Sequence, residues 1–464
     1  MSMPTGDGAR DAALRALLQI ERGAAAGSAL DRALREVPDV RDRALTTELA
    51  YGVTRMVGAL DAELAPLCTR PLQALEPGVR GALRLGLYQL RYMDRIPAYA
   101  AVAGSVDLAR RHARPAAAGL VNAILRKAAA TGPPTPLRAA PGEAPGAAAL
   151  AQAHSHPEWL VRRWLARLGP TETIRLLRAN NRAPAVTLRA NPLRCDGAAL
   201  AAELATGGIT CRPGRWLPEA VVVSRGMAPG RLAAFAAGRC TVQGEASMLV
   251  GHLADPAPGA LCLDVAAAPG GKATHLAERM GNQGTVIAND SAAGRVALCR
   301  SAAARLGLDC IRTQVADGRA LPLAFADRCD VVVADLPCSG LGALAGRPDL
   351  RWRKREADIA ALALLQAELV AAAGRCVKPG GRLVYSTCTT EPEENEAIVA
   401  GFLAAHPDYE PEDARPRLPD ELAAQPGAAA GLVRLWPHLH ETEGFFIAVL
   451  RRQGRGTRPL LQRR

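Results

Sequence analysis

Two cysteines stand at the ends of two predicted buried strands. Cys338 follows the apolar run at 330–336, and Cys388 ends the run at 383–388, just before an acidic turn. The carboxyl ends of parallel strands meet at one edge of a sheet, so both thiols are expected to face one site. A free cysteine is most often a small core residue, but polar turn residues flank both of these. Because a thiolate is both a nucleophile and a leaving group, the pair predicts covalent chemistry.

A turn of small residues predicts a ligand site near these thiols. The segment 261–272, Leu-Cys-Leu-Asp-Val-Ala-Ala-Ala-Pro-Gly-Gly-Lys, is an apolar strand, a turn and the start of a helix. Gly270 and Gly271 let a ligand approach the backbone, and the helix N-terminus offers free N–H groups. The three-glycine spacing of a dinucleotide site is absent. The turn therefore suits S-adenosylmethionine, which has a carboxylate and a nucleoside but no pyrophosphate; a plain strand–turn–helix is the alternative.

Three acids and one lysine are further candidates. Asp290 ends a strand 20 residues after Gly270, where doubly wound folds bind ribose hydroxyls, although such an acid can also cap a helix. Asp317, at the next strand end, is placed to reach an adenine edge or to form an Asp-Gly turn. Asp335 precedes Cys338 and is placed to bind the edge of a pyrimidine. Lys272, one of only four lysines, would add positive charge beside the turn.

The hydrophobic period changes along the chain and predicts several domains. At 464 residues the chain exceeds one ordinary core. Helical spacing of five to seven segments dominates first, and strands alternating with helices dominate last. The predicted parts are an all-α domain at 1–128, a Pro-, Gly- and Ala-rich linker at 129–154, a small α+β domain at 155–237, a doubly wound, Rossmann-like α/β domain at 238–452, and a basic tail at 453–464.

The composition of the chain indicates its class of partner and its cellular compartment. The formal net charge of +12 suggests a polyanion such as nucleic acid, although a solvated surface in an arginine-biased proteome gives the same excess. Eleven cysteines without a CxxC pair argue against a zinc, redox or disulfide framework, so we expect reduced thiols in a cytoplasmic protein without a bound metal. No signal peptide or membrane span is expected, and we expect a monomer.

At these residues the chain resembles the Nop2/Sun family of RNA cytosine-C5 methyltransferases. The matching pieces are AAAPGGK, AND, VADLPCSGLG, YSTCTTEPEENE and HETEGFFIAVL. The stretches RPLQALEPGVRGALRLGLYQLRYMDRIPAYAAV and AAGLVNAILRK resemble the domain of the antitermination factor NusB. The piece SHPEWLVRRWLARLG, with RANN and TLRAN, resembles the small pre-catalytic domain of the family. The resemblance covers nearly the whole chain, excluding the linker and the tail.

The resemblance implies a covalent mechanism and an RNA substrate. Cys388 would add to carbon 6 of a cytosine so that carbon 5 attacks the methyl group of S-adenosylmethionine, and Cys338 would help to release the product, with Asp335 and Lys272 beside the base. The NusB-like fusion implies 16S ribosomal RNA as the substrate. The implied cofactor-binding residues are Ala266, Ala267, Ala268, Pro269, Gly270, Gly271, Lys272, Asp290, Asp317 and Asp335.

Two positions depart from the family pattern, and three other functions stay open. Ala266 stands where the family often has cysteine, and Gly244 replaces a usual acid. The chain could instead methylate cytosine in tRNA, or in DNA with Cys338 as the attacking thiol. From a different class, it could be a non-catalytic RNA-binding or antitermination factor. Intact Cys338 and Cys388 speak against that last function.

Overall fold

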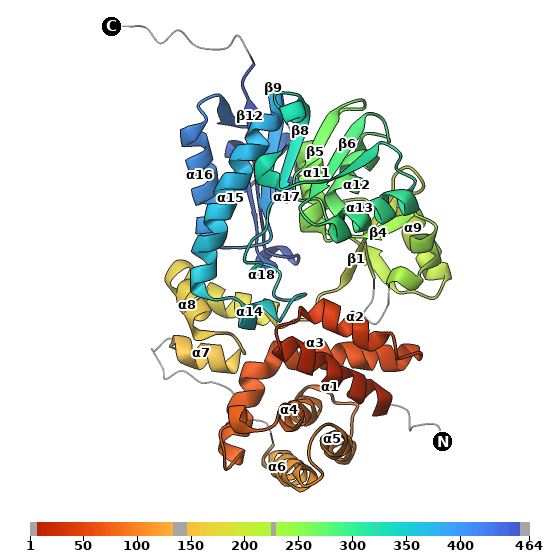
Figure 1. Ribbon diagram of the computed structural model, residues 1–464, viewed down its shortest axis with the longest axis vertical. Coiled ribbons are helices and arrows are strands. Elements are labelled where there is room, and N and C mark those ends of the chain that lie inside the picture. Colours follow the sequence, from red (N-terminus) through yellow and green to blue (C-terminus); the bar gives the residue numbers. More distant parts are fainter. Residues whose placement is uncertain (1–6, 133–145, 224–228, 322, 455–464) are drawn as a thin grey trace. The chain divides into compact units, whose positions relative to one another are not determined.

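The chain forms two compact units, and each of them is built from two separate stretches of the sequence. The computed structural model describes residues 7–132, 146–223, 229–321 and 323–454 (Figure 1). The first unit comprises Met1–Pro184 together with Ala343–Glu356, and the second comprises Ala185–Gly342 together with Ala357–Arg464. The chain therefore leaves the second unit after Gly342 and returns to it at Ala357.

The first unit is helical, as predicted. Helix α3 begins where the side chain of Asp39 accepts hydrogen bonds from the N–H groups of Arg41 and Asp42. Buried leucines at helical spacing, such as Leu83 and Leu87, join the helices in one core, and Figure 1 shows α4, α5 and α6 end-on beside one another. Within residues 7–132 the helices are α1 Asp7–Glu21, α2 Ala26–Leu34, α3 Val40–Leu64, α4 Pro77–Tyr92, α5 Ala98–His112 and α6 Ala117–Thr131.

The described ends of the predicted linker are helical. Helix α6 continues to Thr131, and α7 covers Ala147–Ala153, because the alanine-rich sequence there has high helix propensity. Residues 133–145 of that linker lie outside the described residues, as do 455–464 of the predicted tail. Helix α8, Glu158–Asn180, is interrupted at Gly169, whose φ of 73° breaks the helix where the predicted amphipathic segment ends.

A segment from the second half of the sequence completes the first unit. Residues 343–356 include α14, Leu350–Arg353. The guanidinium of Arg351 is fully buried and donates to the carbonyls of Ser155 and Asn180 at 2.9 and 3.0 Å and to the side chain of Asn181 at 2.7 Å. Trp352 Nε1 donates to the carbonyl of Thr54 in α3 at 2.9 Å. Burial lowers the pKa of Arg351 to about 9.

The second unit starts with a small antiparallel sheet in the strand order β2-β3-β1-β4. Its strands are β1 Val186–Ala190, β2 Cys211–Pro213, β3 Ala220–Val223 and β4 Cys240–Val242, with helices α9 Gly197–Thr206 and α10 Ala233–Ala236. This is the predicted α+β part. However, β4 lies beyond residue 237 and α8 clusters with the first unit, so the contacts divide the chain differently from the predicted boundaries at 155 and 237, which stay predictions.

The large sheet is mixed, with a parallel centre. Its order is β10-β12-β9-β8-β5-β6-β7, and β11 pairs with β12. The five strands from β9 to β7 are parallel, as the doubly wound pattern predicts, and β12 joins β9 in the antiparallel direction. The strands are β5 Leu261–Asp264, β6 Thr285–Asp290, β7 Ile311–Val315, β8 Cys329–Asp335, β9 Val377–Thr387, β10 Tyr409–Pro411, β11 Leu432–Leu435 and β12 Phe445–Arg452.

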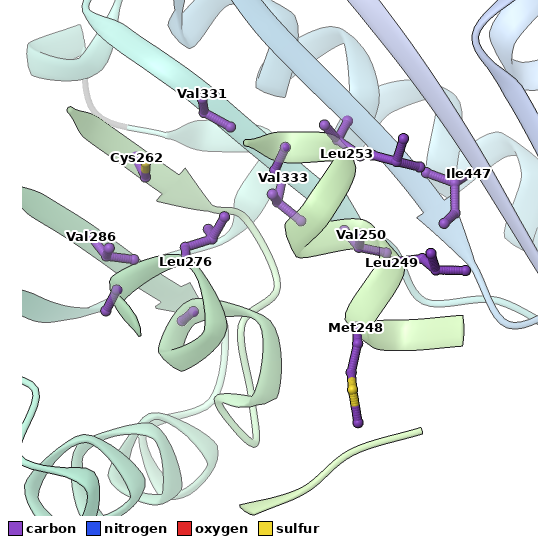
Figure 2. Close-up of a cluster of buried hydrophobic side chains, with 14 of the residues drawn as sticks. Met248, Leu249, Val250, Leu253, Cys262, Leu276, Val286, Val331, Val333 and Ile447 are labelled. Atoms are coloured by element: carbon purple, nitrogen blue, oxygen red, sulfur yellow. The ribbon is translucent and has the colours of Figure 1, made fainter. Parts of the chain in front are cut away.

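Helices cover both faces of this sheet because its strands are apolar on both sides. In β8, Val331 and Val333 face one core, whereas Val332 and Ala334 face the other. The first face packs against α11, Glu245–Ala254, and α12, Gly271–Arg279; Figure 2 shows Leu276 of α12 beside Val286 of β6. Helix α13, Ala293–Leu306, lies on the same side. The second face packs against α15, Glu356–Cys376, and α16, Glu396–Ala405.

Helix α15 is the one described helix that is long and apolar enough to cross a membrane by length and composition. Its residues Leu369, Val370 and Ala373 are buried in the core cluster of the second sheet face. This burial is what a core helix requires, and a core helix passes the same test of length and composition.

A buried ion pair ties the small sheet to the large one. The guanidinium of Arg189 in β1 donates two hydrogen bonds of 2.8 Å to the carboxylate of Glu278 in α12, and both side chains are fully buried. Arg189 also donates to the carbonyl of Gly271, at the first turn of α12, at 2.8 Å. This arginine therefore holds the start of the helix that follows the small-residue turn.

Replacing Arg189 by methionine should destabilise the second unit. The substitution leaves the buried carboxylate of Glu278 without its cation, which we expect to cost roughly 3–5 kcal/mol of unfolding free energy. Urea denaturation of the full chain measures this loss. The double variant Arg189→Met/Glu278→Met removes both charges and should recover most of it; equal stability of the single variant and the wild type would contradict this account.

Candidate active site

The strand order places the site at the carboxyl edge of the large sheet. From β5 the chain proceeds outward through β6 and β7 on one side, and then crosses to β8 and β9 on the other. The reversal lies between β5 and β8, and ligands of open α/β sheets bind in the crevice outside the strand ends at such a point. The loops after β5 and β8 hold the small-residue turn and Cys338, Asp335 is the last residue of β8, and Cys388 directly follows β9.

The turn after β5 is tightly folded around glycine. The peptide bond between Ala268 and Pro269 is cis, and Gly270 has a φ of 108°, a left-handed conformation that other residues rarely adopt. A Cβ atom on Gly270 would lie 3.1 Å from Cα of Cys299, so the backbone also approaches α13 closely there. Of the other predicted turn residues, Ala267 is buried, Ala266 and Ala268 are partly buried, and Pro269 is exposed.

Asp290 lies beside this turn and is joined to it by an arginine. The carboxylate of Asp290 is buried at the end of β6, and it accepts hydrogen bonds from Ala292 N and Arg295 Nε at 3.2 and 3.1 Å. The same guanidinium donates to the carbonyl of Ala268 at 3.0 Å. Asn289 donates to the carbonyls of Val265 and Ala316, which connects the ends of three neighbouring strands. Arg295 was not among the predicted site residues.

Asp317 is exposed and engaged within its own turn. Its side chain accepts from Arg319 N at 2.9 Å and from the guanidinium of Arg319, and it caps the 3-10 helix Gly318–Ala320. These hydrogen bonds lower the pKa of Asp317 to about 2. The geometry is that of the Asp-Gly turn considered above, and contact with an adenine stays a prediction.

Lys272 and Asp335 form an ion pair across the crevice. Lys272 Nζ donates to Asp335 Oδ2 at 2.6 Å, and Ser386 Oγ donates to Asp335 Oδ1 at 2.9 Å. Burial by itself would lower the pKa of Lys272, but the charge and hydrogen bond of Asp335 outweigh it and raise this pKa. The lysine therefore stays an ammonium group, and it joins the first turn of α12 to the end of β8.

The two predicted thiols are in contact. The Sγ atoms of Cys338 and Cys388 lie 3.4 Å apart, and both residues are partly exposed. The hydrogen bond with Cys388, together with burial and the negative charge of Glu394 and Asp335, raises the pKa of the Cys338 thiol well above its usual value. Cys338 therefore holds its proton and can donate it to the sulfur of Cys388.

Asp264, at the end of β5, is a site residue that the sequence analysis missed. Its side chain is 1 % exposed, and neither carboxylate oxygen has a hydrogen-bond partner among the described residues. Burial raises the pKa of Asp264 to about 7, and the nearby ammonium of Lys272 opposes this rise. A buried carboxyl without partners beside a glycine turn is a candidate for binding a cationic group of a ligand. The sequence signal for Asp264 was its position in the segment 261–272, just before the small-residue turn.

Gly244 is the N-cap of α11, and a side chain there would point toward Glu443. A Cβ atom at Gly244 would lie 3.8 Å from a carboxylate oxygen of Glu443, in the HETEG motif, and would meet no other residue within 4 Å. Glu443 thus already places an acid next to the position where the family pattern has one.

One group of potential metal ligands occurs among the described residues, and hydrogen bonds already engage two of its three members. Glu219, His252 and His275 bring ligand atoms within 4.8 Å of one another. Arg279 donates to Nδ1 of His252 at 3.1 Å, so Nε2 of that ring carries the proton and donates to Glu219 at 2.5 Å. Two of the three potential ligands, His252 and Glu219, are thereby engaged with each other, and the arginine adds a positive charge. The expected absence of a metal stays a prediction.

Three known protein families match three successive parts of the chain. The family described as 16S rRNA methyltransferase RsmB/F matches residues 252–451, the NusB family matches residues 7–130, and the ferredoxin-like domain of RsmF/B-like methyltransferases matches residues 156–228. The large sheet with its crevice is thus the catalytic part of a Rossmann-like methyltransferase, and the small sheet is a ferredoxin-like domain.

Individual relatives cover nearly the whole chain. A probable ribosomal RNA small subunit methyltransferase B of Bacillus subtilis is 36% identical over 96% of this chain and 99% of its own length, and one of Synechocystis is 37% identical over 91% and 94%. The crystal structure of PH0851 matches with a TM-score of 0.82 and 29% identity over 97% of this chain and 99% of that chain. The chain belongs to the RsmB/F family and is a methyltransferase.

Replacing Asp264 by asparagine should stabilise the protein at neutral and alkaline pH. The folded-state pKa of Asp264 lies above its unfolded value, so folding favours the protonated form and stability is lost as pH rises from about 4 to about 7. Each unit of this shift corresponds to about 1.4 kcal/mol. Thermal or urea unfolding as a function of pH should show the variant gaining a few kcal/mol over the wild type above pH 7, and little below pH 4.

Asp330→Asn is the control with the opposite sign. Although burial acts against it, the hydrogen bonds and charge of Lys378 and the N–H of Leu261 lower the pKa of Asp330. Its stabilising contribution is present above the unfolded pKa and is lost as pH falls, so this variant should be less stable than the wild type at pH 7. A stability difference between Asp264→Asn and the wild type that does not change with pH would contradict the assignment.

Proposed function

We propose that the protein transfers a methyl group from S-adenosylmethionine to carbon 5 of a cytosine in small-subunit ribosomal RNA, with Cys388 as the nucleophile. The observation that carries the proposal is the pair of thiols 3.4 Å apart, beside the Lys272–Asp335 ion pair, at the switch point of a methyltransferase sheet. The relatives in Bacillus subtilis and Synechocystis are named as small-subunit rRNA methyltransferases.

The residues around the turn fit S-adenosylmethionine. The unpartnered carboxyl of Asp264 can accept hydrogen bonds from the ammonium of the methionine part, Gly270 allows close approach to the backbone, and Asp290 stands at a ribose position. A structural relative, NSun6 from Pyrococcus horikoshii with SFG, an analogue of S-adenosylmethionine, has a TM-score of 0.56, 25% identity, and covers 64% of this chain and 98% of that chain. When bound, the cofactor supplies an electrophilic methyl group.

The two cysteines divide the chemistry between them. Cys388, next to the positive charge of Lys272, adds as a thiolate to carbon 6 of the cytosine, and this addition makes carbon 5 nucleophilic. Once carbon 5 carries the methyl group, its proton must leave before the bond between sulfur and carbon 6 can break. Cys338 keeps its proton in the resting site; after the attack it releases this proton to solvent, and its thiolate then takes the proton from carbon 5. Cys388 then departs with the electron pair of its bond.

Asp335 and Lys272 orient the base. Asp335 is held by Lys272 and Ser386 and keeps part of its carboxylate exposed, so it can accept a hydrogen bond from the amino group of a cytosine, and from N3 once N3 is protonated in the adduct. The reaction requires a base that has left its stack, because both thiols lie at one point of the crevice. An unpaired cytosine in a loop costs the least to extrude.

The other parts of the chain are assigned to RNA binding. The NusB-family match covers residues 7–130, and the formal net charge of +12 suits a polyanion. We assign the helical part, predicted at 1–128, to RNA affinity and none of the chemistry, and 238–452 to catalysis. A monomer acting in the cytoplasm, where rRNA is made, completes the proposal.

Asp290→Ala should weaken the binding of S-adenosylmethionine. Loss of charge-assisted hydrogen bonds to the ribose should cost roughly 2–4 kcal/mol of binding free energy. Isothermal titration of the full chain with the cofactor measures this. Asp309→Ala, which removes an exposed acid at the start of the next strand, is the matched control and should bind normally. Unchanged affinity in Asp290→Ala would remove this residue from the site.

Substitution of the two cysteines should separate attack from release. Cys388→Ala cannot form the adduct and should have almost no activity. Cys338→Ala should attack and transfer the methyl group, then stall as a covalent protein–RNA complex. Denaturing electrophoresis of the reaction with labelled 16S rRNA should show a slow band that disappears with nuclease.

The alternatives predict other outcomes of the same experiment. A DNA-type mechanism predicts loss of attack in Cys338→Ala, so the absence of a trapped complex there, or its presence in Cys388→Ala, would refute the assigned roles. Selective methylation of tRNA would reassign the substrate. Cofactor binding without methyl transfer to any RNA would point to a non-catalytic RNA-binding factor.

A further inference from the structure

A buried glutamate lies directly behind the loop that carries Cys338. Glu394 is fully buried at the end of the 3-10 helix Pro392–Glu394, in the acidic turn that follows Cys388. Its Oε1 accepts from the backbone N–H of Ser339 at 2.8 Å, and its Oε2 accepts from the hydroxyl of Ser339 at 2.5 Å. Ser339 is the residue next to Cys338, so the carboxylate holds the peptide that carries the thiol.

Two further side chains, those of Gln366 and Tyr385, form hydrogen bonds with Glu394. Gln366 of α15 donates through Nε2 to the carbonyl of Pro337 at 2.9 Å and to Glu394 Oε1 at 3.1 Å, so the loop is held on both sides of Cys338. The hydroxyl of Tyr385 donates to the carbonyl of Glu394 at 2.5 Å and is 3.3 Å from Oε1 of Gln366. Glu394, Gln366, Tyr385 and Ser339 are all at most 1 % exposed. We call these four residues the Glu394 cluster.

The same cluster is joined to the strand that carries Cys388. The hydroxyl of Ser339 is 2.8 Å from that of Thr389, and the N–H of Gly342 donates to the carbonyl of Cys388 at 3.0 Å. The two cysteine segments are therefore connected on the side of the thiols that faces the protein interior. These contacts leave the loop little freedom to move Cys338 away from Cys388.

We propose that Glu394 is a positioning residue, which holds the loop 337–339 so that the thiol of Cys338 stays in contact with that of Cys388. A carboxylate is suited to this because it accepts from a backbone N–H, a hydroxyl and an amide at once. Glu394 touches neither substrate nor cofactor, and it acts on product release through Cys338. The predicted effect of Glu394 on turnover rests on the proposed function, whereas its predicted effect on the position of Cys338 rests on the structure alone.

The geometric part is tested on the full-length protein without RNA. Diamide, a thiol oxidant that takes up two electrons and two protons, converts the two thiols to a disulfide, whose sulfur atoms must come within about 2.05 Å. Peptide mass spectrometry follows the Cys338–Cys388 bond over time. Glu394→Ala should form it about tenfold or more slowly, because small misplacements of reacting groups cost rates of this order. Glu394→Gln keeps an acceptor for the Ser339 N–H and should resemble the wild type.

Turnover with RNA then tests the consequence. Glu394→Ala should carry out a single turnover of methyl transfer at close to the wild-type rate, lose multiple turnover, and accumulate the nuclease-sensitive covalent band that Cys338→Ala defines. Glu394→Gln should release product normally. Glu396→Gln is the control, because Glu396 lies two residues further on and pairs at the surface with Arg434.

The outcomes separate this inference from the proposed function. Equal rates of disulfide formation in Glu394→Ala and the wild type would overturn the positioning role, whatever the RNA assays give. No covalent band in Cys338→Ala would refute the covalent mechanism and leave the disulfide assay to decide on Glu394. If Glu394→Ala fails to fold, as judged by cofactor binding and circular dichroism, Gln366→Met removes the hydrogen bonds to the carbonyl of Pro337 and to Glu394 and should show the same slow disulfide formation; a wild-type rate there overturns the inference.

Discussion

The ion pair between Lys272 and Asp335 is the interaction on which the site depends, because it links the start of α12, which follows the loop after β5, to the end of β8, which precedes the next loop. These loops come together only because the strand order reverses between the two strands. One side of the crevice then has the glycine turn, and the other has an acid and a thiol. The charge of Lys272 acts on Asp335 and on Cys388 and so links the two sides electrostatically.

Several other charged side chains are buried in the second unit, and they differ in the groups that compensate their charge. Arg189 and Glu278 neutralise each other and are structural. Glu394 is satisfied by neutral donors, which a carboxylate needs when no cation is near. Asp264 lies near the ammonium of Lys272 but has no side-chain hydrogen-bond partner among the described residues, so its burial costs stability in the free protein. A group that is destabilising alone and favourable with a ligand is typical of a binding site, where stability is exchanged for function.

The sequence alone predicted the fold class and the motifs well because these depend on local patterns. Alternating apolar runs mark β5, β6, β8 and β9, and strand ends in a parallel sheet share an edge, so Cys338 and Cys388 were expected to face one site, and their Sγ atoms lie 3.4 Å apart. Asp264, Arg295 and Glu394 were not singled out, because their roles depend on partners distant in the sequence. The helix at 147–153 was missed because the neighbouring prolines and glycines dominate the composition. The division of contacts at Pro184 and Gly342 has no local signal at all.

The placement of residues 343–356 in the first unit has a consequence for the order of synthesis. Domains generally fold as units from the N-terminus while the chain is being made. Here the buried Arg351 fills acceptor sites on Ser155, Asn180 and Asn181, and Trp352 reaches the carbonyl of Thr54. The helical unit therefore stays incomplete on the ribosome until the ribosome has passed residue 356, by which time strands β1 to β8 have already emerged or are emerging. Completion of the first unit therefore requires synthesis of most of the second unit.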